Sequence, residues 1–238
     1  MTRRAFGLTP GFEIAGKYEV LEKLGSGWEG EVYRVREKRV GVERAAKLFF
    51  PENGSSARAV RFYARKLHKL RRCKILIQYH AGEKIEWDGR PVDVLISEYV
   101  EGEMLADFVR RRPGGRLAPF EGLHLLHELA SGVEEIHRAG EYHGDLHDDN
   151  IFVRRKGLSF NLKVVDMYNW GRPRAENVRD DVCDMVRILY DVLGGRPRYA
   201  RQPDVVKYIV SGLKRSIITR KFRTAGHLRR HLESMEWE

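Results

Sequence analysis

The sequence predicts an α+β fold in which a small antiparallel β part with one helix precedes a larger, mainly helical part. Segments with strand-like alternation fall before residue 100, and long segments with helical periodicity follow Pro119. We expect one domain over residues 1–238, with a first lobe at 18–100 and a second at 101–238. A chain of 238 residues leaves no room for a further domain of ordinary size.

In the first part, residues 18–49 read as three strands. Residues 57–72 read as a helix, because apolar side chains recur on one face at helical spacing. Residues 75–100 read as two strands around Asp88-Gly89, a pair typical of a tight hairpin turn.

In the second part, residues 120–139 predict a long amphipathic helix that stops at Gly140. Three more helices are expected, at 178–193, 204–213 and 225–233. Between the first two helices, residues 151–153 and 161–165 predict a hairpin with a basic turn at 154–157.

The most informative stretch is His143-Gly144-Asp145-Leu146-His147-Asp148-Asp149-Asn150, with Asp166 sixteen residues after it. Asp145 would accept or orient the proton of an attacking hydroxyl, and Asn150 and Asp166 would supply oxygen ligands to Mg²⁺. The predicted hairpin would bring Asn150 and Asp166 to the same end of one ribbon. A polar turn without chemistry is the alternative for so short a cluster.

A second motif, Leu24-Gly25-Ser26-Gly27-Trp28-Glu29-Gly30-Glu31-Val32-Tyr33, carries three glycines that let the backbone approach phosphates. The dinucleotide-binding fingerprint requires a helix directly after such glycines. Here the following residues alternate as a strand, so a phosphate-covering hairpin is favoured. Lys47, in a short strand further on, is a candidate for holding phosphates; a lysine on the polar face of a strand is the alternative.

In this order, these elements resemble the protein kinase superfamily, in a minimal, atypical bacterial-type Ser/Thr kinase-like form. The resemblance implies a two-lobed fold, ATP and Mg²⁺ as cofactors, and Asp145, Lys47 and His147 as catalytic residues. Asn150 and Asp166 would be the metal ligands, and Asp181 would brace the catalytic loop. The nucleotide contacts that the resemblance implies are Gly25, Gly27, Gly30, Val32, Ala45, Lys47, the backbone of Glu98 and Val100, and Phe152.

Several positions depart from the family pattern. The glutamate that pairs with the strand lysine is absent, since the matching helical position is Tyr63 or Ala64. Glu29, Glu83 and Glu86 are three candidates for replacing it, and the sequence does not choose among them.

The catalytic loop and the segment after it depart as well. Gly144 replaces the arginine that receives an activating phosphate, and residues 167–180 contain no Ser or Thr. Control by phosphorylation of that segment is therefore not expected. His147 stands where many kinases have lysine; it would assist the phosphoryl group, shuttle a proton, or orient the loop.

Three functions remain open: an ATP-dependent protein Ser/Thr kinase, which we favour, a kinase-fold enzyme acting on a small molecule or glycan, and a pseudokinase that serves as a binding module. Only two cysteines are present, which fits a reducing cytoplasm, and no apolar run approaches a membrane span. The net charge is +10, with many basic residues at 57–74. We expect an acidic partner or protein substrate to dock there, with nucleic acid as the alternative.

Overall fold

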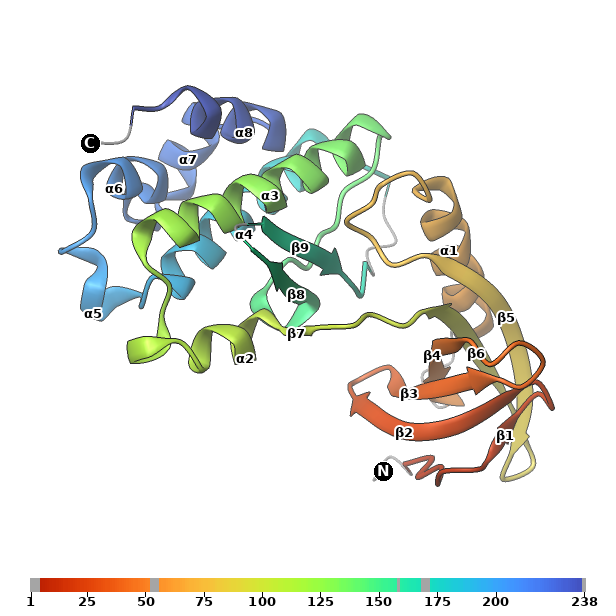
Figure 1. The fold of residues 1–238 in the computed structure, drawn as a ribbon. Coiled ribbons are helices and arrows are strands. Elements are labelled where there is room, and N and C mark those ends of the chain that lie inside the picture. The colour runs from red at the N-terminus through yellow and green to blue at the C-terminus, as the bar shows by residue number, and fades with distance from the viewer. Residues whose placement is uncertain (1–4, 52–55, 158, 168–171, 237–238) are drawn as a thin grey trace. The chain divides into compact units, whose positions relative to one another are not determined.

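The computed structural model describes residues 5–51, 56–157, 159–167 and 172–236. It divides into two compact units (Figure 1). The first comprises residues 1–72 and 77–100, and the second comprises residues 73–76 and 101–238. Within the described ranges, no helix combines the length and hydropathy that a membrane crossing requires.

The first unit contains a six-stranded antiparallel sheet in the order β1-β2-β3-β4-β6-β5. Its strands are β1 (Glu13–Ile14), β2 (Tyr18–Ser26), β3 (Gly30–Glu37), β4 (Glu43–Phe49), β5 (Tyr79–Trp87) and β6 (Arg90–Glu98). The three strands expected within 18–49 are confirmed. So is the β5–β6 hairpin, which turns at Asp88 and Gly89, both with positive φ.

The apolar core of this unit extends into an N-terminal segment that the sequence did not predict. Phe6 and Leu8 are buried, and the Phe6 ring stacks on Phe50 at a centroid distance of 5.1 Å. The backbone N–H of Leu8 donates to the Tyr33 hydroxyl at 3.1 Å. The segment before β1 is therefore an integral part of the β unit.

Helix α1 (Ser56–Lys69) contacts β5 and β6. Val60, Tyr63 and Leu67 are buried, as their helical spacing indicates. The helix ends at Lys69, three residues earlier than expected, and the chain turns at 70–72. The expected strand start at residue 75 is wrong, because β5 begins at Tyr79; Leu76 instead bridges to Val164 within the second unit.

The second unit is mainly helical, with a three-stranded sheet in the order β7-β8-β9. Its long helices are α3 (Pro119–Arg138) and α4 (Ala175–Val192). Its shorter helices are α2 (Leu105–Arg110), α5 (Arg196–Tyr199), α6 (Asp204–Val210), α7 (Arg215–Lys221) and α8 (Ala225–Ser234). The strands are β7 (Glu103–Met104), β8 (Ile151–Lys156) and β9 (Ser159–Val164). The four predicted helices thus exist with shifted ends, and the expected helix at 204–213 stops at Val210, where left-handed Ser211 starts a 3₁₀ turn.

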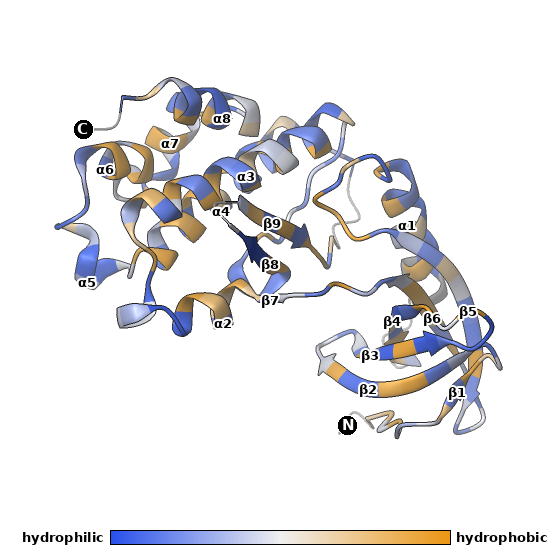
Figure 2. Ribbon diagram, in the orientation of Figure 1, coloured by the Kyte–Doolittle hydropathy of each residue, from blue (hydrophilic) through white to orange (hydrophobic). Residues whose placement is uncertain are grey.

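The predicted hairpin is also present, but its basic residues belong to a strand. Arg154, Arg155 and Lys156 continue β8 and pair with β9, whereas the sequence placed them in the turn. The arrowhead of β8 is accordingly strongly hydrophilic in Figure 2. Arg154 and Arg155 bind Glu101 and Glu121, which explains why a strand tolerates three consecutive basic residues.

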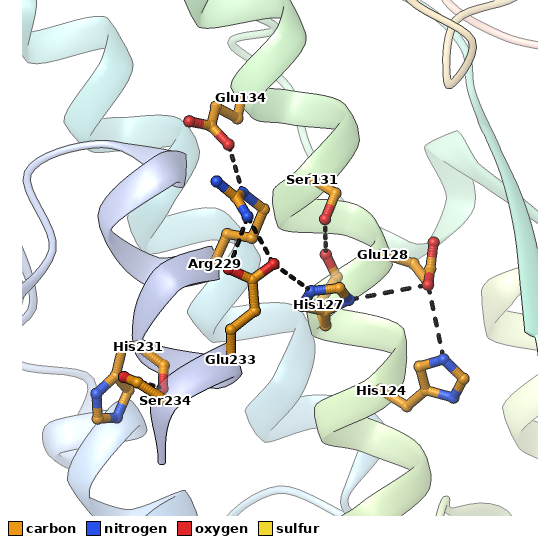
Figure 3. Close-up of polar contacts among 9 residues, drawn as sticks. All are labelled: His124, His127, Glu128, Ser131, Glu134, Arg229, His231, Glu233 and Ser234. Carbon is orange, nitrogen blue, oxygen red and sulfur yellow. Dashed lines mark hydrogen bonds and ion pairs between the residues drawn. The ribbon is translucent and has the colours of Figure 1, made fainter.

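Helix α3 is joined to α8 by a polar cluster that Figure 3 shows in detail. Arg229 donates to Glu134 on α3 and to Glu233 one turn along α8. His127 lies 3.2 Å from the Glu233 carboxylate. A Cβ built on Gly226 would lie 2.4 Å from Oε1 of Glu134, so the buried carboxylate packs directly on the α8 backbone.

Candidate active site

The glycine motif forms the turn between β2 and β3, with Ser26 paired to Glu31 and Gly25 to Val32. The N–H of Gly27 donates to the Gly30 carbonyl at 2.9 Å, which closes the turn. Gly30 has a packing role, because a Cβ there would lie 1.8 Å from the Leu48 carbonyl oxygen. Around Gly25 and Gly27, no described atom approaches an added Cβ within 4 Å. Of the three glycines in the motif, Gly25 and Gly27 therefore leave open backbone for a ligand.

Lys47 forms an ion pair with Glu29 in the glycine turn, with 3.0 Å between Nζ and Oε2. The two side chains are only 12% and 17% exposed. The turn is held in register because the Phe50 N–H donates to the Glu29 carbonyl at 2.8 Å. Of the three candidate counter-ions, Glu83 binds Lys17 and Glu86 is exposed on β5. The structure thus brings Glu29 to the lysine.

Val32, Ala45, Lys47 and Ser97 lie on one face of the β sheet. Val32 pairs with Lys47 across β3 and β4, and Ala45 pairs with Ser97 across β4 and β6. Since side chains alternate between faces, the intervening Ala46 and Leu48 point the other way, into the buried core. At the end of β6, the Glu98 N–H donates to the Gln78 carbonyl, and Val100 follows outside the strand.

In the second unit, the loop at 141–150 is ordered around Asn150. Its amide nitrogen donates to the backbone oxygen of Asp145 at 2.9 Å and to Oδ2 of Asp145 at 3.2 Å. Asn150 is 7% exposed, whereas the Asp145 side chain is 58% exposed. A buried amide thus orients a carboxylate that remains accessible to solvent.

The same loop is anchored by Asp181 of α4, which is completely buried. Its two oxygens accept from the N–H groups of His143 at 2.8 Å and Gly144 at 2.7 Å. His137 of α3 lies 2.9 Å from Asp181 Oδ2. Sequence reasoning found Asp181 through the family resemblance but missed His137, since a single histidine on a helix carries no distinguishing spacing.

Two backbone features place the polar ends of the β8–β9 hairpin together. Ile151 pairs with Val164, and the Val165 N–H donates to the Asn150 carbonyl at 3.0 Å. The predicted return of residue 166 to the Asn150 end of the ribbon is therefore confirmed. Asp166 adopts φ +56, a left-handed conformation that aspartate tolerates better than most residues.

His143 is fully buried and has one defined tautomer. Its Nδ1 accepts from the Asp145 N–H at 3.2 Å, so its Nε2 carries the proton and donates to the Val165 carbonyl at 3.0 Å. One imidazole thus connects the backbone of the 141–150 loop to Val165, the residue after β9.

The pKa of Asp184, a carboxyl group whose charge interacts with that of Asp145, is raised. Burial, together with the charges of Asp181, Asp180 and Asp145, raises the pKa of Asp184 to about 6. His147 lies near Asp145, with 3.7 Å between Nε2 of His147 and Oδ2 of Asp145. Neither ring nitrogen of His147 forms a hydrogen bond within the described part of the chain, and the nearest carboxylate oxygens, of Asp145 and Asp149, lie at 3.7 and 4.0 Å.

The segment after Asp166 is short. Met167 is buried, Tyr168 lies outside the described residues, and α4 begins at Ala175. The helix expected from residue 178 thus begins three residues earlier, within the segment 167–180.

Figure 1 shows a β unit and a helical unit of the kind that define a two-lobed kinase fold. The family model "Protein kinase domain" matches residues 18–177. The chain therefore belongs to the protein kinase family.

Curated relatives agree with this family. A serine/threonine-protein kinase, pkn2, of Myxococcus xanthus is 30% identical over 188 residues, which are 78% of this chain and 21% of that protein. Cyclin-dependent kinase B2-2 of Arabidopsis thaliana is 33% identical over 172 residues, which are 68% of this chain and 52% of that protein. The chain thus spans about a fifth to about half of the length of these two relatives.

Among solved structures, the PknI kinase domain of Mycobacterium tuberculosis is similar in fold. A double mutant of that domain superposes with a TM-score of 0.69 at 19% identity, over 96% of this chain and 98% of that one. At this level of identity the likeness extends to the fold alone.

Proposed function

We propose that the protein is an ATP-dependent protein Ser/Thr kinase in which Asp145 receives the acceptor hydroxyl. The observation that carries this proposal is the Asn150–Asp145 contact within a loop braced by Asp181. In phosphoryl transfer the protein mainly positions the reactants and stabilises charge. An exposed carboxylate held by a buried amide suits that task, because it accepts a proton without moving.

The nucleotide would be held by groups of the β unit. The open backbone of Gly25 and Gly27 offers N–H groups to phosphates, and Lys47 supplies a cation beside them. Val32 and Ala45, on the same sheet face as Lys47, would contact the adenine ring, and Phe152 of β8 is the third residue that we assign to this contact. The backbone groups of Glu98 and Val100 would pair with the edge of the base.

The residues of the helical unit fit a magnesium ion. Asn150 uses its amide nitrogen on Asp145, which leaves the amide oxygen as its acceptor. Amide and carboxylate oxygens are the ligands that Mg²⁺ prefers, and Asp166 supplies the carboxylate. When bound, such an ion neutralises phosphate charge. Asn150 and Asp166 would hold it, while Asp145 stays available for the hydroxyl.

The Glu29–Lys47 pair favours an active kinase over a pseudokinase, because it restores a counter-ion for the strand lysine. A small-molecule or glycan acceptor is the second candidate, favoured by the HGDLH loop.

Transfer of labelled phosphate from ATP in the presence of Mg²⁺ tests the proposal, with cell lysate and with small hydroxyl compounds as separate acceptors. We expect labelled protein Ser/Thr residues, and loss of labelling in Asp145→Asn with ATP affinity unchanged. Labelling of Asp145→Asn at the wild-type rate would contradict the role of Asp145. Labelling of small acceptors alone would instead favour the second candidate.

We also propose that an acidic region of the substrate docks on the outer face of α1. Arg58, Arg61, Arg65 and Lys69 are exposed there, and residues 56–74 contain no acidic side chain. Like charges at helical spacing repel one another by a few tenths of a kcal/mol per pair, so the face is not optimised for stability. An acidic segment would relieve that repulsion.

Charge reversal tests this surface. Arg61→Glu/Arg65→Glu/Lys69→Glu should slow phosphorylation of the substrate and reduce its salt dependence, while ATP hydrolysis continues. The matched control reverses Arg220, Arg223 and Arg230, which are exposed on the helical unit. Equal effects of the two triple variants would show that only net charge matters.

A further inference from the structure

A surface cavity of about 500 Å³ lies within the helical unit, between the loop that precedes α3 and the residues that follow α5. This volume is in the range of small-molecule sites. Its polar lining consists of Arg112, Arg116, Glu121, Arg198, Arg201 and Gln202. It lies at the opposite end of α3 from His137, and none of the residues assigned to phosphoryl transfer lines it.

The lining carries an excess of positive charge. The one carboxylate, Glu121, is already shared between Arg112 and Arg155, each at 2.6 Å. Within the described ranges, Arg116, Arg198 and Arg201 form no ion pair with the protein. Three guanidinium groups around one cavity thus lack a counter-charge, which is an unfavourable arrangement unless an anion supplies it.

The backbone is shaped to bring two of these arginines together. A Cβ on Gly194 would lie 2.9 Å from Cγ of Arg198 and 3.2 Å from Cδ of Arg116, so both side chains pass over this glycine. Gly194 has φ +97, which other residues rarely adopt. The aliphatic parts of both side chains thus pack on the same glycine, which fixes the bases of two cationic side chains at one wall of the cavity.

The side-chain amide of Gln202 is a second, independent observation that points to a ligand in this cavity. Its Nε2 donates to the Leu193 carbonyl at 3.1 Å, which fixes the orientation of the amide. Its Oε1 is buried and has no hydrogen-bond partner in the part of the chain that the structure describes. A buried acceptor without a partner is costly, and a hydroxyl on a ligand in the cavity would satisfy it.

We propose that this cavity binds a small ligand that carries two or more phosphate groups and at least one hydroxyl. Guanidinium groups match phosphate oxygens through paired N–H donors, and three unpaired arginines require more than one phosphate charge for neutrality. The positive N-terminal end of the α3 dipole, which starts at Pro119 in the cavity wall, adds to the attraction. This site is independent of the proposed kinase activity.

Calorimetric titration with fructose 1,6-bisphosphate as the probe tests the proposal. Arg116→Gln/Arg198→Gln should weaken binding at least tenfold, and Arg201→Gln alone should weaken it severalfold. The matched control is Arg110→Gln/Arg111→Gln, which removes the same charge from neighbouring arginines that bind Asp107 and Glu103 instead of the cavity. The control and Lys47→Ala should bind the probe within about twofold of wild type.

Without ligand, Arg116→Gln/Arg198→Gln should melt at or above the wild-type temperature, because the substitution removes repulsion between like charges. Equal affinity of this variant and wild type would overturn the proposal, as would loss of binding in Lys47→Ala or absence of binding at millimolar probe. A singly phosphorylated serine peptide that binds more tightly than the bisphosphate would overturn it in favour of a phosphopeptide surface. If the double variant fails to fold, Arg201→Gln, which is exposed, decides the outcome.

Discussion

Replacing Glu29 with glutamine should impair the proposed kinase by removing a counter-ion of Lys47. Their charged groups are 3.0 Å apart and mostly shielded from water. Coulomb's law at an effective dielectric constant of about 20 gives a gross attraction of about 5 kcal/mol at this separation. Desolvation of both ions offsets most of it, and a charge-assisted hydrogen bond contributes a net of about 1.5–3 kcal/mol. The expected loss in kcat/KM for ATP is therefore about 10- to 100-fold.

Steady-state kinetics with ATP as the varied substrate measures this loss. Glu83→Gln is the control, because it removes a carboxylate from the same unit whose partner, Lys17, is 61% exposed; we expect a change of less than about twofold. In a Lys47→Met background, Glu29→Gln should have little further effect, since the two residues act as a pair. A Glu29→Gln enzyme with unchanged kcat and tighter ATP binding would refute the reasoning, because Glu29 would then compete with the phosphates.

Three further predictions concern single residues of the helical unit. Asp166→Ala should remove the Mg²⁺ dependence of ATP binding in calorimetry, and an unchanged dependence would exclude Asp166 as a ligand. Asp184→Asn should stabilise the fold by about 1–2 kcal/mol at pH 8, because ionisation of a carboxyl with a raised pKa costs the folded state free energy. The wild type regains this stability as the pH falls from about 6 towards 4. The free energies of unfolding that urea titration gives for the two proteins should therefore converge over this pH range. A difference that stays constant with pH would contradict the raised pKa of Asp184. Gly226→Ala should destabilise the protein by about 1–3 kcal/mol, since the new methyl group meets Glu134; an unchanged melting temperature would show that the carboxylate moves freely.

Periodicity predicted the elements that are long enough to show it. The three strands within 18–49, the hairpin at Asp88-Gly89 and the long helices are all present. The short elements β1, β7, α2, α5 and α7 were missed. β1 and β7 have two residues each and α5 has four, which are too few for a repeat to appear. The N-terminal segment was missed for a different reason: its burial depends on the stacking of Phe6 on Phe50, a contact between distant parts of the sequence.

For the candidate site, the sequence named residues but could not choose partners. From the sequence alone, Glu29, Glu83 and Glu86 were equivalent candidates for the counter-ion of Lys47. The choice among them depends on how the glycine turn folds back onto the end of β4. Asp184 was not anticipated, because its pKa is raised mainly by burial, which depends on tertiary packing, and further by the charges of Asp181, Asp180 and Asp145. Local pattern therefore predicts which groups carry chemistry, whereas their electrostatic environment requires the tertiary structure.

The hydrogen bonds to Asp181 determine how fast two backbone amides of the 141–150 loop exchange with solvent. The N–H groups of His143 and Gly144 both donate to a carboxylate that is completely buried on α4. Their exchange with deuterium therefore requires that carboxylate to be exposed, which means separation of the loop from the helical core. These amides should exchange as slowly as those of the α3 and α4 interior, although they belong to a surface loop. Exchange at that rate would mean that the loop keeps its shape until the helical core opens.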